Sequence, residues 1–207
     1  MWDERYAIDD YLFGTEPADF LRREVDALEP GAHALVIADG EGRNSVFLAE
    51  RGLRVTAMDA SAVAIGKARR LAAAREVDVD FVVADLLAWS WDEAAVDVVV
   101  GIFFQFLEPD ERAVVFEGMA RTLRPGGRLL VHGYRPEQVA YGTGGGPRPE
   151  LKYTEALLRT AFAGFTIDRL EGYDTEIAEG SGHLGMSALI DLVATKPGGE
   201  PDRTAAG

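Results

Sequence analysis

Between residues 34 and 134 the chain alternates short apolar runs with longer segments whose apolar residues recur at helical spacing. The apolar runs predict strands, and they are residues 34–38, 53–58, 79–83, 96–101 and 128–134. The clearest helices are predicted over 62–76, with Ser61 as the N-cap, and over 109–123. This regular alternation favours an α/β sandwich built on a mostly parallel sheet.

After residue 134 the pattern changes. A glycine-rich irregular stretch over 135–150 precedes a short predicted helix over 153–162, and runs at 165–176 and 185–195 predict two more strands. The sheet would then have seven strands, with an antiparallel last strand. We expect one domain over 1–196 and a disordered tail over 197–207.

Residues 1–32 precede the first strand and carry many aromatic side chains. They predict either an edge of the core or a lid that folds over a ligand. Thr15 is the expected N-cap of a helix in this segment, with Pro17 in its first turn, and Pro30-Gly31 would end that helix.

The composition excludes several classes of partner and site. The 207 residues carry a net charge of −14 without a basic stripe, so nucleic acid is not an expected partner. The chain has no cysteine and three histidines, which argues against disulfides, a thiolate nucleophile and a metal site. With no signal-like opening and no run of about 18 apolar residues, we expect a cytoplasmic protein without a membrane partner.

The stretch 34–59 reads as a strand, a glycine turn, a helix, a strand and an acid. Gly40 and Gly42 leave room for a ligand to approach backbone amides at the N-terminus of the helix. Asp59 ends the second strand, where its two oxygens match the vicinal hydroxyls of a ribose. This order of elements predicts a nucleoside site.

Asp85 ends the third strand, where it could accept from the exocyclic amine of a base, and Leu86 and Leu87 could pack on the ring. A glycine turn followed by acids at two successive strand ends is more specific than any of these parts alone.

The chain resembles the class I S-adenosylmethionine-dependent methyltransferases in its glycine turn, Asp59, the pair Ala84-Asp85 and the L-R-P-G-G turn at 123–127. It is more closely similar to the small bacterial tellurite-resistance and thiopurine methyltransferase-like proteins. That similarity rests on the opening W-D-E-R-Y, on Tyr11, on the motif G-T-E-P-x-D-F-L at 14–21 and on the turn G-E-G-R-N at 40–44.

The resemblance implies a Rossmann-like three-layer sandwich and methyl transfer from S-adenosylmethionine to a small-molecule acceptor by in-line displacement. It implies that the residues holding this cofactor are Asp39, Gly40, Gly42, Arg43, Asn44, Asp59, Ala60, Asp85, Leu86 and Ile102. Asp39 would serve the methionine amino group, and Arg43 would either pair with its carboxylate or lie on the surface of the helix. The chain departs from the family at Val36, in place of the first-strand acid, and at Ala38, in place of the first glycine.

The acceptor is expected to lie in an aromatic pocket, which suits a soft sulfur, selenium or tellurium nucleophile or an aromatic ring. The predicted walls are Tyr6, Tyr11, Phe13, Phe104, Tyr134 and Tyr141, and Phe104 could equally belong to the core. Gln105 is a candidate to hold the acceptor, and His183 is either a general base or an exposed loop residue.

Two other functions fit part of this pattern. A nicotinamide-dependent oxidoreductase shares the glycine turn and Asp59, although Ser45 replaces its third glycine. The second alternative is a non-catalytic module that binds S-adenosylmethionine. The protein is expected to be a monomer or a homodimer.

Overall fold

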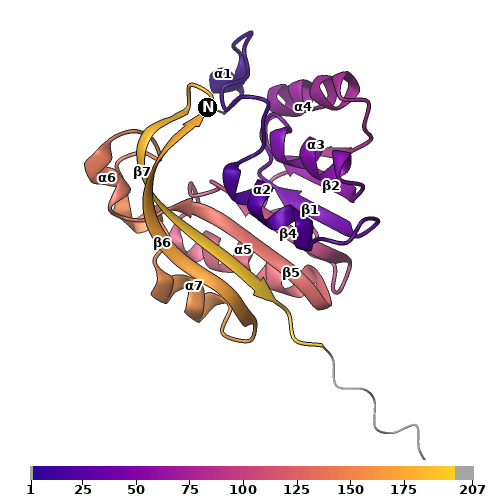
Figure 1. Cartoon of the computed structure of the whole chain (residues 1–207), viewed down its shortest axis with the longest axis vertical. Helices are drawn as coiled ribbons and strands as arrows, with labels where there is room; N and C mark the ends of the chain where they lie inside the picture. Colours follow the sequence, from indigo (N-terminus) through magenta and orange to yellow (C-terminus); the bar gives the residue numbers. More distant parts are fainter. Residues whose placement is uncertain (1, 199–207) are drawn as a thin grey trace, which may run out of the picture.

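The computed structural model describes residues 2–198, which form a twisted central sheet with helices on both faces (Figure 1). Its strands run in the order β3-β2-β1-β4-β5-β7-β6. Neighbouring strands from β3 to β5 are parallel, and β7 is antiparallel to both β5 and β6. The strands are β1 (His33–Ile37), β2 (Arg54–Asp59), β3 (Asp80–Val83), β4 (Val96–Ile102), β5 (Leu123–Tyr134), β6 (Thr166–Glu179) and β7 (His183–Thr195).

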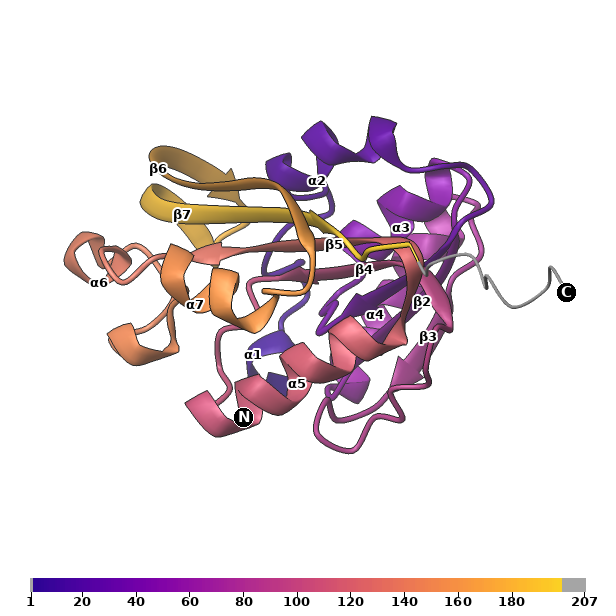
Figure 2. The same cartoon turned by 90° about the horizontal axis from the view of Figure 1, so that it is seen from below.

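Two helical layers cover the sheet, as Figure 2 shows edge-on. One face carries α2 (Asp19–Glu24), α3 (Arg43–Glu50) and α4 (Ala62–Ala74), and the other carries α5 (Pro109–Thr122) and α7 (Glu155–Ala161). The strands supply both cores by alternation: Ala34 and Val36 face α3 and α4, whereas Leu35 and Ile37 face α5. Shorter elements are α1 (Trp2–Tyr6), η1 (Val25–Ala27), α6 (Gln138–Tyr141) and η2 (Pro149–Leu151).

The predicted α/β class and the seven-stranded, mostly parallel sheet with an antiparallel last strand are confirmed. Ser61 is the N-cap of α4, and its Oγ accepts from the amide of Ala64 at 3.1 Å. The final hairpin is longer than predicted, because pairing continues to Glu179 opposite His183. The predicted tail lies outside the described residues except for 197–198.

The N-cap prediction at Thr15 was wrong. Helix α2 begins at Asp19, and Ala18 occupies the N-cap position without a side-chain cap. The amide of Ala18 instead donates to Oδ1 of Asn44 at 3.0 Å, so a contact with the glycine turn fixes where this helix starts.

The strand order reverses direction between β1 and β4. From β1 the chain moves outward through β2 and β3, and it then returns to build β4 and β5 on the other side. Loops leaving the carboxyl ends of β1 and β4 therefore diverge and open a crevice, where ligands of this class of sheet bind.

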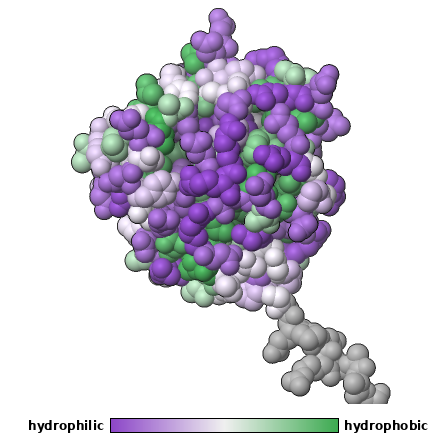
Figure 3. Space-filling view, viewed as in Figure 1, coloured by the Kyte–Doolittle hydropathy of each residue, from purple (hydrophilic) through white to green (hydrophobic). Residues whose placement is uncertain are grey.

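The face in Figure 3 is mostly hydrophilic, with its apolar residues in small separate areas. Over residues 2–198, none of the helices combines the length and the apolar character that a membrane crossing requires.

Two glycines, Gly42 at the N-cap of α3 and Gly66 in α4, provide a test of the packing. Gly42 has φ 93°, and a Cβ there would lie 2.7 Å from Cβ of Ala68 in α4. We expect Gly42→Ala to destabilise the protein by at least about 2 kcal/mol, because strain and overlap add. Gly66→Ala in α4 is the matched control, since a Cβ there meets nothing within 4 Å and alanine favours a helix by up to about 1 kcal/mol. Urea denaturation measures both variants, and equal stabilities would contradict this packing.

Candidate cofactor and acceptor site

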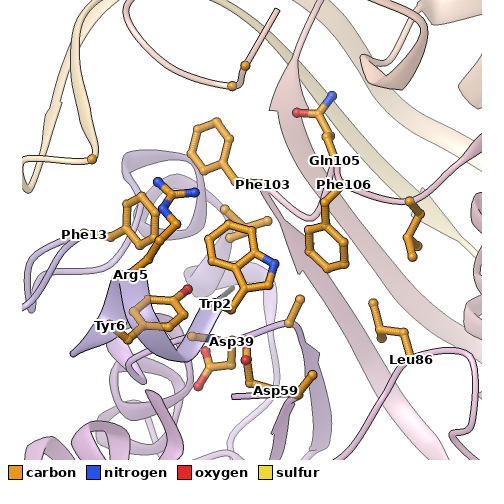
Figure 4. A pocket seen from close by; sticks show the side chains of 18 of the residues that line it. Trp2, Arg5, Tyr6, Phe13, Asp39, Asp59, Leu86, Phe103, Gln105 and Phe106 are labelled. Carbon is orange, nitrogen blue, oxygen red and sulfur yellow. Dashed lines mark hydrogen bonds between the residues drawn. The ribbon is translucent and has the colours of Figure 1, made fainter. Parts of the chain in front are cut away.

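A cavity of about 750 Å³ lies at the carboxyl ends of β1 to β4, within the usual size of small-molecule sites. Figure 4 shows side chains from the N-terminal segment, the strand ends and the loop after β4 converging on it. The cavity is also lined by the glycine-rich stretch 144–148 and by Gly182 and His183 from the hairpin.

The glycine turn forms one end of the cavity. Asp39 is buried, and its carboxylate accepts from Oγ of Ser45 at 2.5 Å and from the Ser45 amide at 3.3 Å. Burial raises the pKa of Asp39 to about 7, against the lowering effect of Ser45, and the charge of Asp59 raises it further. Gly40 lines the cavity, whereas Gly42 lies against α4, where its lack of a Cβ leaves room for Ala68. The prediction that Gly42 contacts a ligand stays a prediction.

Asp59 is held in a fixed orientation beneath the cavity. Its Oδ2 accepts from the Gly40 amide at 2.9 Å and its Oδ1 from the Ser61 amide at 2.8 Å. Burial raises the pKa of this carboxyl group, and the two amides act in the opposite direction. Each oxygen keeps a lone pair that can accept from a hydroxyl group of a ligand.

The other predicted cofactor contacts lie side by side along the strand ends. Asp85 is exposed at the rim, where it accepts from the Leu87 amide at 2.9 Å. Leu86 is buried beside it. Ala60 and Ile102 line the same wall.

Arg43 and Asn44 line the cavity at the start of α3. Arg43 is buried, and its guanidinium pairs with Glu179 of β6 at 2.7 Å. Its predicted partner was the carboxylate of methionine, but this carboxylate of the protein already neutralises it. Asn44 uses its Oδ1 to accept from the Ala18 amide, a contact that joins the turn to α2, and its predicted contact with the cofactor stays a prediction.

The N-terminal segment covers the cavity and is anchored by a buried ion pair. Nζ of Lys67 in α4 lies 2.8 Å from Oε1 of Glu41 in the glycine turn. Lys67 also donates to the carbonyl of Asp10 at 2.7 Å, and Glu41 accepts from the amide of Phe13 at 3.4 Å. The far end of the segment is tied to the hairpin, because the Gly182 amide donates to the carbonyl of Leu12 at 2.9 Å.

Aromatic rings form the end of the cavity beyond β4. His183 lies between Phe13 and Phe103, with ring centroids 4.4 and 4.2 Å away, and Tyr134 closes the group at 5.7 Å. Burial, with the charge of Arg43, lowers the pKa of His183 to about 3. Its Nδ1 is buried and has no hydrogen-bond partner among residues 2–198.

His183 is thus buried rather than exposed, but it is a weak base at neutral pH. A general base is most effective when its pKa is near the working pH, and it is usually oriented by an acceptor on its other nitrogen. His183 has neither property here, so this environment does not favour the general-base role that was predicted.

The side-chain amide of Gln105 contacts Tyr134. Its Nε2 donates to the carbonyl of Tyr134 at 2.7 Å, and its Oε1 accepts from the Tyr134 amide at 2.6 Å. Both ends of the amide are therefore engaged with the backbone of Tyr134 at the cavity wall, and the prediction that Gln105 holds the acceptor stays a prediction.

Three predicted pocket residues lie outside the cavity lining. Phe104 is buried in the core beneath α5, where it contacts Phe116 and Tyr153. Tyr11 packs over α4, and its hydroxyl donates to the carbonyl of Lys67. Tyr141 is exposed on α6, with its hydroxyl 3.0 Å from Asp174. Tyr6, Phe13 and Tyr134 do line the cavity.

Sequence reasoning missed four charged residues of this site: Arg5, Glu41, Lys67 and Glu179. Glu41 and Glu179 had no visible partners, because their ion pairs join residues 26 and 136 positions apart. Arg5 could have been singled out from its spacing with Trp2 and Tyr6, since positions i, i+3 and i+4 share one helical face. Within residues 2–198, no three His, Cys, Asp or Glu side chains gather in a group that could hold a metal ion.

Residues 34–127 match the family model of a methyltransferase domain. The chain contains a methyltransferase domain. This match covers the glycine turn, Asp59, Asp85 and the turn before β5, and it confirms the predicted resemblance to the class I S-adenosylmethionine-dependent methyltransferases.

Comparisons with individual proteins agree with the domain match. Over 142 aligned residues the chain is 33% identical to a demethylmenaquinone methyltransferase from Renibacterium salmoninarum. The aligned region covers 67% of this chain and 54% of that protein. The chain spans about half the length of the first curated relatives it matches.

Two solved structures share the fold. One comes from work on the conversion of a disulfide bond into a thioacetal group during echinomycin biosynthesis. It has a TM-score of 0.77 and 22% identity, and covers 94% of this chain and 88% of that one. The other is TehB from Haemophilus influenzae, with a TM-score of 0.69, 17% identity and coverage of 85% and 61%.

The pKa of Asp39 predicts a pH dependence of stability. In the unfolded chain its carboxyl ionises near pH 3.8, whereas in the folded protein it keeps its proton until about pH 7. The contribution of Asp39 to stability should therefore fall as pH rises from about 4 to about 7, by at most about 1.4 kcal/mol per pH unit, and change no further above that range. Asp39→Asn should lose this slope. Urea denaturation across this range measures the difference between the two proteins, and parallel curves would contradict a raised pKa.

Proposed function

We propose that this protein transfers a methyl group from S-adenosylmethionine to a small-molecule acceptor. The observation that carries the proposal is the row of groups along the strand ends: Asp85 after β3, Asp59 on β2 and Asp39 after β1, all lining one cavity. These are the positions at which a sheet of this kind holds a nucleoside.

The residues present fit this cofactor. Asp59 has a free lone pair on each oxygen for the two ribose hydroxyls. Leu86 offers an apolar surface for the adenine ring, and Asp85 is placed to accept from its amine. Gly40 has φ 63°, and a Cβ there would meet the Tyr6 hydroxyl at 2.9 Å, so a side chain at this position would narrow the cavity.

The chemistry that S-adenosylmethionine supplies when bound is an activated methyl group on a sulfonium. The protein has to bring the acceptor into line with it and exclude water. Phe13 and Phe103 offer polarisable ring faces next to the expected position of the sulfonium, and such faces stabilise a cation. The N-terminal segment closes the site on the solvent side.

The environment of His183 bears on the type of acceptor. A neutral histidine of low basicity takes up a proton poorly at pH 7. We therefore propose that the acceptor attacks as a thiolate, another soft anion or an ionised oxygen, so that the protein need not remove a proton in the transfer step. His183 then serves as a neutral wall of the acceptor pocket.

The aromatic wall also suits a planar acceptor that stacks on the rings. The curated relatives are demethylmenaquinone methyltransferases by name, and an ionised ring hydroxyl or ring carbon in such an acceptor would fit the same wall. Soft anions and planar aromatic compounds are thus the two classes of acceptor that suit this wall.

Binding of S-adenosylhomocysteine, measured by isothermal titration calorimetry, tests the cofactor site. The wild-type protein should bind it, whereas Asp59→Ala should weaken binding by about tenfold to a hundredfold, because two hydroxyls lose their acceptor. Asp174→Ala is a control with the same charge change away from the cavity. Binding of NAD without either adenosyl ligand would instead favour an oxidoreductase.

Turnover with a panel of thiols, oxyanions and phenols separates an enzyme from a binding module. Formation of S-adenosylhomocysteine should rise with the ionised fraction of the acceptor, and His183→Asn should retain much of the rate. A methyl donor that binds without any turnover across the panel would contradict the enzymatic proposal.

A further inference from the structure

The structure leaves one end of the proposed cofactor without an obvious partner. With the ribose on Asp59 of β2 and the base toward Asp85 after β3, the methionine arm must extend to the other side, over β1 and β4. Its carboxylate would then meet a surface that already carries Asp39, Glu41 and Asp59. A cation there would offset this negative charge and provide strong hydrogen bonds to a carboxylate.

Three arginines line the cavity, and two of them are already neutralised. Arg43 pairs with Glu179 at 2.7 Å, and both side chains are buried. Arg148 is held by two carboxylates, with Glu108 at 2.5 Å and Glu150 at 2.7 Å. Breaking either arrangement would leave a carboxylate of the protein unpaired.

Arg5 is the third arginine. Its guanidinium lies 4.6 Å from the centre of the Trp2 ring, and within residues 2–198 it forms no ion pair with a carboxylate. Figure 4 shows it directed into the cavity near Phe13 and Phe103, on the side away from Leu86. This is the side toward which the methionine arm would extend.

The helix that carries Arg5 is fastened to the ribose side of the site. The carboxylate of Asp3 accepts from the hydroxyl of Ser61 and from the Val63 amide at the start of α4. The Ser61 amide in turn donates to Asp59. One short chain of contacts thus links α1 to the residue proposed to hold the ribose, and it fixes where Arg5 enters the cavity.

We propose that Arg5 binds the carboxylate of the methionine moiety, so that α1 is part of the cofactor site. This inference rests on the proposed function. A guanidinium matches the two oxygens of a carboxylate, and such paired charged contacts are among the strongest hydrogen bonds in proteins. Arg5 is thus a binding and positioning residue, which aligns the sulfonium by holding the far end of its chain.

Two nucleosides distinguish this role by isothermal titration calorimetry: S-adenosylhomocysteine has the amino-acid arm, and 5′-methylthioadenosine lacks it. Arg5→Ala should weaken the binding of S-adenosylhomocysteine about tenfold or more and change the affinity for 5′-methylthioadenosine less than about twofold. Arg5→Lys should fall between Arg5→Ala and wild type. Arg22→Ala is the matched control, because it removes an arginine of the same segment that pairs with Glu16 outside the cavity, and it should change neither affinity.

Equal weakening of both nucleosides by Arg5→Ala would overturn the inference, because it would show a general effect on the lid. An unchanged affinity for S-adenosylhomocysteine with a raised KM for the acceptor would also overturn it, by assigning Arg5 to the other substrate. If the wild-type protein binds neither nucleoside, the proposed function itself fails, which is a different result from either.

Discussion

The buried ion pair between Glu41 and Lys67 is the contact on which the site depends. It joins the glycine turn to α4 at 2.8 Å, and both residues also bond to the N-terminal segment, through the amide of Phe13 and the carbonyl of Asp10. Two buried charges carry a desolvation cost that is offset only by close pairing and further hydrogen bonds, which this arrangement supplies. Without it, the segment that covers the cavity would lose two of its attachments to the rest of the fold, at Asp10 and at Phe13.

Because of this attachment, two parts of the chain line the cavity: the strand ends and the N-terminal segment. Strand ends contribute the acids Asp39 and Asp59, which are held rigidly by amides and by Ser45. The lid contributes Trp2, Arg5, Tyr6 and Phe13, and the hairpin between β6 and β7 ties its far end through Gly182 and Leu12. The same segment therefore lines both ends of the cavity. Under the proposed function, this would couple binding of the cofactor to the shape of the acceptor pocket.

The sequence predicted well what local pattern and strand order determine. The strand ends at Asp59 and Asp85 follow from apolar runs, and the cap at Ser61 from local chemistry. It did not predict contacts between distant residues: Gln105 is bound to Tyr134, Phe104 packs in the core and Arg43 pairs with Glu179 of β6. The local sequence around either partner does not indicate these pairings, because each depends on how the sheet brings segments together that are distant in the sequence.

The central claim is that one cavity holds the nucleoside on the strand ends and the acceptor under the lid. A crystal structure of the complex with S-adenosylhomocysteine tests it most directly. The account predicts ribose hydroxyls within about 3 Å of Asp59, with the sulfur facing the aromatic group of Phe13, Phe103 and His183. A nucleoside bound elsewhere, or a sulfur directed away from those rings, would contradict the account.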